Sequence, residues 1–346
     1  MSLARRLPEV LVPALLVLAT ALLGLAVSSY LQAYFLDTLI KVAIVVGLYV
    51  FIGNSGVLSF GQISFVAVGA WTAGVLTVPK EQKLVLMPGL AHFLVTTTVG
   101  NVASLALAAA VGAVFAFAVG LPLMRLSGLA AGIATFAVLE ITNNILNYET
   151  RIGPALNNFA SVPATTGMWQ AAVGAIICIG VAYAYQRTRF GRMLRATRED
   201  PAAAAAAGIS IYRQRLLAFT VAGALAGFAG GLFVHLQPVA ANDLFLDLTF
   251  ITLAMLVVGG SGSLLGAVVG ALAVNGVYSF FTAAVNTVDV FGWHLHVRAG
   301  TAQIVLGALM VIVLIFRPSG LTGGREFSLP RRRRRVADLE KARATT

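Results

Sequence analysis

Small and polar residues interrupt an apolar stretch of the chain at positions 53–65, with Ser59, Phe60, Gly61 and Gln62 at its centre. Glycine permits close backbone approach and breaks regular helix. Ser and Gln can bond the backbone groups that such a break frees, or line a polar path for a solute. We predict that these four residues lie beside a translocation path. The alternative is that they serve only close helix packing.

Glu140 lies within another apolar stretch, at 126–147, and three asparagines follow it within two helical turns. A carboxylate inside a membrane costs about 2.5–3.5 kcal/mol on insertion scales and marks function by default. We therefore add Glu140 to the predicted path, although it lies toward one end of its stretch. Lys41, four residues after Asp37, can pair with that acid or extend toward the membrane surface.

A basic segment at 187–215 combines helix signals with arginines at helical spacing. Asp200 can cap a helix that begins at Pro201, six alanines favour its continuation, and Gly208 suits its end. A short helix of small residues fits a groove in a partner protein; the alternative is a loop that only sets topology. The residues predicted to couple this segment to a partner are Arg192, Arg195, Arg198, Glu199, Asp200 and Gly208.

Two glycine series have the spacing of close helix crossings. Packing is the prediction for both, in preference to ligand contact. The series comprise Gly223, Gly227 and Gly231, and then Gly259, Gly260, Gly262 and Gly266.

The composition places these residues in a membrane. Of 346 residues 59% are hydrophobic and 11% charged, against roughly 25% charged in soluble domains. The apolar runs are continuous rather than alternating, which predicts helices and not a barrel. We expect an all-α polytopic protein of about ten spans, some of them short or broken. The predicted spans are 10–29, 38–53, 57–76, 97–122, 126–147, 169–186, 215–236, 247–261, 264–282 and 300–316.

The charge distribution predicts the orientation. Segment 187–215 holds seven arginines against two acids, and 317–346 holds nine basic residues against three acids, which together equal the net charge of +11. Short cytoplasmic loops carry the Lys/Arg excess, so both segments and both termini are expected in the cytoplasm. The loops expected outside are then 30–37, 77–96, 148–168, 238–246 and 283–299.

The domain prediction follows from the same charges. We expect residues 1–325, including the basic segment 187–215, to form a transmembrane domain, and residues 326–346 to form a basic, disordered cytoplasmic tail. The tail contacts anionic lipid headgroups of the bilayer rather than nucleic acid. We expect Cys178 to be a packed apolar residue and His294 and His296 to be surface residues. No metal site and no catalytic residue is therefore predicted. No phosphate-binding loop is present, so the chain does not itself use ATP in the usual way.

Four segments resemble, in order, signature regions of the branched-chain amino acid ABC transporter permeases of the LivM type. They are residues 59–62 with Gly69 and Ala70, residues 189–200 with the following Gly208, residues 259–266, and residues 317–321. The resemblance extends from about residue 40 to residue 321.

This resemblance implies two halves of inverted topology, five spans each, in a bacterial inner membrane. It implies a homologous LivH-type permease partner, two ATPase subunits that bind ATP and Mg, and an external binding protein. No cofactor in this chain and no enzymatic activity of its own are implied. Residues 149–168 lack a glycine-rich run common in the family, so branched-chain amino acids, urea and short amides all stay open as substrates. The first alternative is a self-sufficient secondary transporter or channel, and the second alternative is a membrane enzyme.

Overall fold

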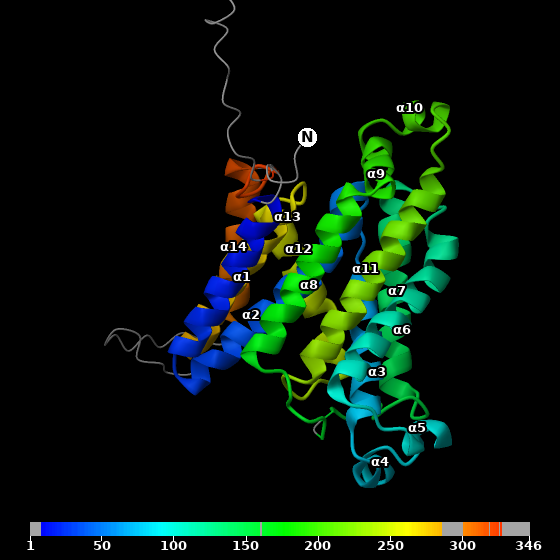
Figure 1. Ribbon diagram of the computed structural model, residues 1–346, viewed down its shortest axis with the longest axis vertical. Coiled ribbons are helices and arrows are strands. Elements are labelled where there is room, and N and C mark those ends of the chain that lie inside the picture. Colours follow the sequence, from blue (N-terminus) through cyan, green and yellow to red (C-terminus); the bar gives the residue numbers. More distant parts are fainter. Residues whose placement is uncertain (1–7, 160, 286–299, 318, 325, 327–346) are drawn as a thin grey trace, which may run out of the picture.

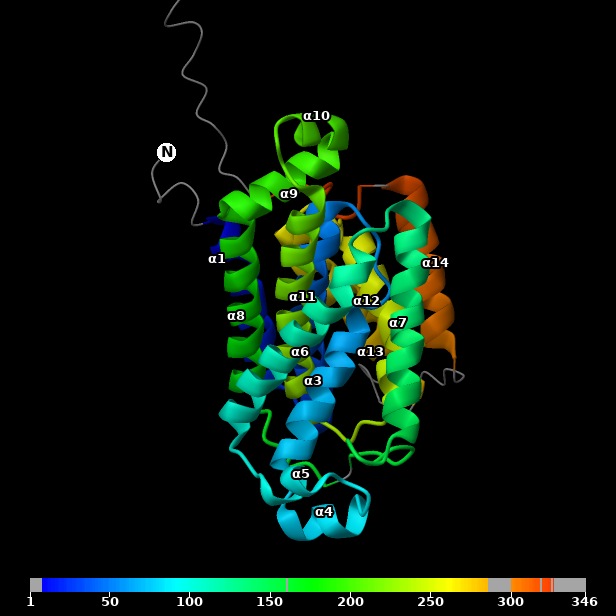
Figure 2. The same cartoon turned by 90° about the vertical axis from the view of Figure 1, so that its right-hand side faces the viewer.

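The computed structural model describes residues 8–159, 161–285, 300–317, 319–324 and 326, which form a helical bundle without strands (Figures 1 and 2). Each of its ten longest described helices overlaps one predicted span, which confirms the polytopic α-helical class. These helices are α1 (Pro8–Ala26), α2 (Ser29–Leu48), α3 (Gln62–Thr77), α6 (Asn101–Leu123), α7 (Gly128–Tyr148), α8 (Met168–Arg187), α11 (Ile211–Val234), α12 (Leu246–Gly259), α13 (Leu264–Val285) and α14 (Thr301–Phe316).

The helices differ in their ability to cross a membrane. Eight helical stretches in the described part of the chain are long and apolar enough to do so, and one of them, Ala241–Gly259, joins α12 to the residues before it. By contrast, α3 and α14 have 16 residues each. α3 meets the short helix α4 (Lys80–Leu86) at an angle of 119°. The count of ten spans therefore stays a prediction.

Two predicted boundaries are wrong. The expected loop at 30–37 is helical, because α2 begins at Ser29 and Asp37 pairs with Lys41 one turn later, at 2.7 Å. The expected span at 57–76 becomes helical only at Gln62. Residues 54–61 between the π-helical end of α2 (η2, Tyr49–Gly53) and α3 are largely irregular.

Two buried helices, α2 and α11, run in opposite directions through the bundle (Figure 1). In their membrane-crossing windows, 83% and 72% of the residues are buried. Each ends in an irregular segment that leads into a short helix: residues 54–61 lead into α3, and residues 235–245, which include η3 (Ala241–Leu244), lead into α12. We call these segments break A and break B. Helix α11 packs on α3 and α6, and α2 packs on α12 and α13, so each central helix packs on the opposite half of the chain.

The breaks lie at opposite ends of the molecule. Break A is at the end that carries α9 (Arg189–Glu199) and α10 (Pro201–Ala206), the α10 end. Break B is toward the end that carries α4 and α5 (His92–Thr96), the α4 end (Figure 2). There, Lys83 of α4 lies buried and donates to the backbone oxygens of Leu94 and Thr97. Burial, and secondarily the nearby Lys80 charge, lowers the pKa of Lys83.

Glycines allow the backbones to approach at the central crossings. A methyl group at Gly227 would meet the Ala108 carbonyl oxygen of α6, and one at Gly259 would meet the Gly266 carbonyl oxygen of α13. Close approach through small residues is a common way for membrane helices to associate. Gly223 faces α6, and Gly231 faces Leu105 of the same helix, whereas Gly260 and Gly262 lie against residues 319–324.

Candidate functional site

Helices α9 and α10 form a projecting hairpin at the α10 end (Figure 2). The Asp200 carboxylate accepts from the Ala202 and Ala203 backbone N–H groups, both at 2.9 Å, and Pro201 occupies the first helical position. Gly208 follows with a φ of +79°, which favours glycine. The predicted cap, start and end of this helix are confirmed. Most of its alanines are exposed, so α10 presents small side chains away from the bundle.

Two arginines of α9 bond break A to this hairpin. Arg195 donates through Nε to the Asn54 side-chain oxygen at 2.7 Å, and through a terminal nitrogen to Gln186 at 2.8 Å. Arg198 donates to the Gly53 carbonyl oxygen at 2.5 Å. Bonds from charged donors are roughly twice as strong as neutral ones. These bonds join α9 to Gly53, at the end of η2, and to Asn54, at the start of break A.

The other predicted coupling residues occupy different places. Arg192 and Glu199 are exposed on α9, whereas Asp200 and Gly208 shape the ends of α10. The structure thus brings Arg195 and Arg198 together with break A, and leaves Arg192 and Glu199 on the open surface of the hairpin.

Break A contains three of the predicted path residues, Ser59, Phe60 and Gly61, and Gln62 follows it as the first residue of α3. Ser59 and Gln62 are each 1% exposed. The Ser59 hydroxyl, both polar side-chain atoms of Gln62 and the Ser64 hydroxyl have no hydrogen-bond partner among the described residues. The Phe60 N–H donates to the Thr135 hydroxyl at 3.2 Å, and a methyl group at Gly61 would lie 2.6 Å from the Thr135 carbonyl oxygen. The last two residues of break A therefore pack closely against Thr135 of α7, whereas Leu58 is 53% exposed.

Glu140 lies on α7 but faces away from the bundle. Its carboxylate is exposed and accepts from the Asn144 side chain on the next turn at 2.9 Å. The structure therefore places it on the outer surface of this chain, while the other four predicted path residues lie in or beside break A.

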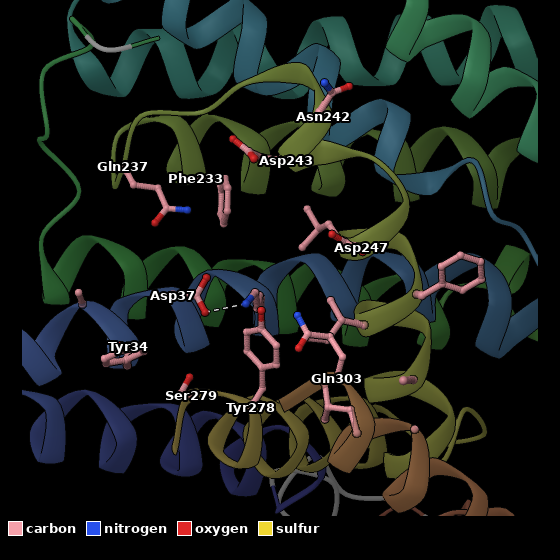
Figure 3. A pocket seen from close by; sticks show the side chains of 18 of the residues that line it. Tyr34, Asp37, Phe233, Gln237, Asn242, Asp243, Asp247, Tyr278, Ser279 and Gln303 are labelled. Carbon is pink, nitrogen blue, oxygen red and sulfur yellow. Dashed lines mark hydrogen bonds and ion pairs between the residues drawn. The ribbon is translucent and has the colours of Figure 1, made fainter. Parts of the chain in front are cut away.

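A cavity of about 810 Å³ lies between α2, α12, α13 and α14, with break B at its edge (Figure 3). Its polar lining includes Asp37, Lys41, Gln237, Asn242, Asp243, Asp247, Tyr278 and Gln303. Its apolar lining includes Phe233, Phe250, Ile251, Leu306 and Met310. Apolar walls with a few convergent polar groups are typical of small-molecule sites.

A buried polar cluster forms one wall of this cavity. Lys41 donates to Asp37 at 2.7 Å and to the Asn275 side-chain oxygen at 3.0 Å. Asn275 in turn donates to the Thr38 hydroxyl at 2.7 Å and to Asp37 at 3.1 Å. The predicted Asp37–Lys41 pair is confirmed, but the cavity was not foreseen. The available signals were Asn275 within the apolar α13 and Asp247 in the first turn of α12.

The remaining sequence predictions fall partly outside the described residues. His294 and His296 do so, as does the basic tail at 326–346 apart from Glu326. The Glu326 carboxylate accepts from the Leu264 N–H at 2.8 Å. Cys178 is fully buried.

The chain resembles transport permeases throughout most of its length. The family model described as "Branched-chain amino acid transport system / permease component" matches residues 30–314. The high-affinity branched-chain amino acid transport system permease protein LivM of Salmonella typhimurium is 28% identical over 320 residues, 82% of this chain and 68% of that protein. The Escherichia coli LivM is 27% identical with the same coverage.

A second type of permease is also similar. The probable branched-chain amino acid transport permease protein LivH of Methanocaldococcus jannaschii is 32% identical over 155 residues, 43% of this chain and 45% of that protein. No solved structure matches the chain.

Proposed function

Because the chain belongs to the family of branched-chain amino acid transport system permease components, we propose that it is the membrane-spanning subunit of an ATP-driven importer. Its substrate is a branched-chain amino acid or a related small polar solute. A LivH-type permease is its membrane partner, two ATPase subunits bind ATP and Mg, and an external binding protein delivers the substrate. Its membrane is the bacterial inner membrane, and its own role is transport rather than catalysis.

The α10 end faces the cytoplasm in this proposal, together with both termini. The support is the arginine excess of 187–215, which surrounds α9 and α10. Short cytoplasmic loops carry such an excess in membrane proteins. The cavity beside break B then lies toward the outer side, from which an importer receives its substrate.

The observation that carries the proposal is the pair of arginine contacts between α9 and break A. An ATPase that binds the exposed small face of α10 moves α9 with it, because a single capping residue, Asp200, separates the two helices. Arg195 and Arg198 then displace Asn54 and Gly53. This displacement opens the packed segment that contains Ser59 and Gln62.

The unpartnered polar atoms of break A and of the adjoining first turn of α3 support the same cycle. A buried polar group without a hydrogen bond costs about 1–3 kcal/mol, and Ser59, Gln62 and Ser64 carry four such atoms. These atoms gain water or solute as partners when the segment opens. ATP binding shifts the equilibrium only by its differential affinity for the two states.

Reconstitution in liposomes tests the proposal. The ATPases and ATP are inside the liposomes, and binding protein loaded with labelled L-leucine is outside. Liposomes that hold the complete complex are expected to accumulate labelled leucine. Accumulation should require ATP and every subunit, and should continue after ionophores remove all ion gradients. Accumulation by this chain alone, driven by an ion gradient, would instead establish the secondary transporter.

A further inference from the structure

The cavity beside break B holds formal charges of both signs. Asp37, Asp243 and Asp247 supply three carboxylates, and Lys41 supplies one ammonium. Ionisable groups inside a membrane-spanning bundle are functional candidates by default. Asp37 and Lys41 are fixed by neighbours, whereas Asp247 is not, and this difference separates their roles.

Lys41 is held in one position with bonding capacity to spare. Its ammonium group has three N–H donors, and its side-chain hydrogen bonds go to Asp37 and Asn275. The ammonium also lies 5.3 Å from the centre of the Tyr278 ring. The residue is only 6% exposed, yet it lines the cavity. A ligand carboxylate can therefore accept the third N–H of a cation that is already in place.

Asp247 is a carboxylate without a partner in the described part of the chain. It lies in the first turn of α12, where the helix dipole favours a negative charge. Its side chain is exposed, projects into the cavity in Figure 3, and makes no hydrogen bond or ion pair with any described residue. Asp243 differs, since it accepts from the Ala240 N–H at 2.8 Å. Asp247 is thus the acid best placed to receive a ligand cation.

Apolar side chains complete the lining. Phe250, Ile251 and Ala254 follow Asp247 on the cavity-facing side of α12, and Leu306 and Met310 line the cavity from α14. An aliphatic group of a ligand whose charged end lies near Asp247 would contact these side chains.

We propose that this cavity is a binding site in the permease itself for a zwitterionic α-amino acid with an aliphatic side chain. Asp247 binds the ammonium group, Lys41 binds the carboxylate, and Phe250, Ile251 and Leu306 contact the aliphatic chain. The inference rests on the proposed function for its substrate class, which it narrows: urea and short amides lack both charged ends.

Equilibrium binding to the complex in nanodiscs, without the binding protein, tests the site. The probes are labelled L-leucine, isoamylamine, which lacks the carboxylate, and isovalerate, which lacks the ammonium. Asp247→Asn should weaken leucine and isoamylamine by about 10- to 100-fold, the loss of one charge-assisted bond, with isovalerate unchanged. Glu149→Gln, an exposed acid outside the cavity, is the matched control.

The site for the ligand carboxylate needs a double variant, because Lys41→Met alone leaves Asp37 unpaired. The double variant Asp37→Leu, Lys41→Met removes both charges and should weaken leucine and isovalerate, but not isoamylamine. Leucine binding that is unchanged by either variant, absent in the parent complex, or matched by urea or acetamide overturns the site. In those cases ATP-driven uptake measured in parallel shows separately whether the proposed function stands.

Discussion

Breaks A and B are built alike and held differently. Each follows a long buried helix and leads into a short one, but break A is packed and bonded to α9 by Arg195 and Arg198. Break B is at the edge of the cavity, which Gln237, Asn242 and Asp243 line with exposed side chains. His235, at the start of break B, is buried, and its Nε2 has no partner among the described residues. Ser59 of break A, and Gln62 and Ser64 at the start of α3, carry buried polar atoms without a partner among the described residues. In the cavity wall, Asp37, Lys41 and Asn275 bond one another. In the proposed cycle, the α10 end opens when the ATPases act, and the α4 end receives the solute.

The largest expected effect comes from cutting the link between α9 and break A. Arg195→Ala with Arg198→Ala should lower uptake by the assembled transporter more than tenfold while ATP hydrolysis continues, because the ATPases no longer move Asn54 and Gly53. Uptake and hydrolysis are measured in the same liposomes. Arg213→Ala, another exposed arginine near the hairpin, is the control. An equal loss of both activities would contradict the link.

The cavity wall should respond next most strongly. Lys41→Met leaves Asp37 and Asn275 without their cation and should destabilise the chain by about 2–3 kcal/mol. Removing one partner of a fully buried pair costs about 3–5 kcal/mol, and the side chain of Asp37 keeps 18% exposure. Thermal unfolding in detergent measures the change. If Lys41→Met is as stable as the parent chain, the cluster does not hold this wall together.

A substitution at the junction of break A and α3 should raise the stability of the chain instead of lowering it. Gln62→Leu removes two buried atoms that have no partner and should stabilise the packed state by about 1–2 kcal/mol. The same thermal measurement should show a higher midpoint, and uptake should fall because the open state loses a polar lining. A lower midpoint would mean that Gln62 is already satisfied in the packed state.

The smallest effect is expected at the hairpin cap. Asp200→Ala removes two bonds to the α10 N-terminus and should cost about 1 kcal/mol. Amide exchange at Ala202 and Ala203 should accelerate accordingly. Glu199→Ala, its exposed neighbour, should leave that exchange unchanged; equal acceleration in both variants would show that the cap contributes nothing specific.

Local features of this molecule could be predicted from the sequence, and contacts between distant residues could not. The helix positions, the Asp200 cap and the Asp37–Lys41 pair follow from hydrophobic runs and four-residue spacing. Break A was recognised by its residues, but its bond from Arg195 to Asn54 joins positions 141 residues apart. The cavity escaped prediction for the same reason, since Asp247 and Lys41 come from different halves of the chain. Only tertiary packing places them in the same cavity.

Labelling of a cysteine in break A tests most directly whether the hairpin opens that segment. In a Cys178→Ala background, Ser59→Cys should react slowly with a water-soluble maleimide, because Ser59 is 1% exposed. Its rate should rise at least tenfold when ATP and loaded binding protein engage the complex, and should not rise with Arg195→Ala and Arg198→Ala. Ala206→Cys on exposed α10 controls for access of the reagent. A Ser59→Cys rate that ATP leaves unchanged, or that rises equally without the two arginines, would contradict the account.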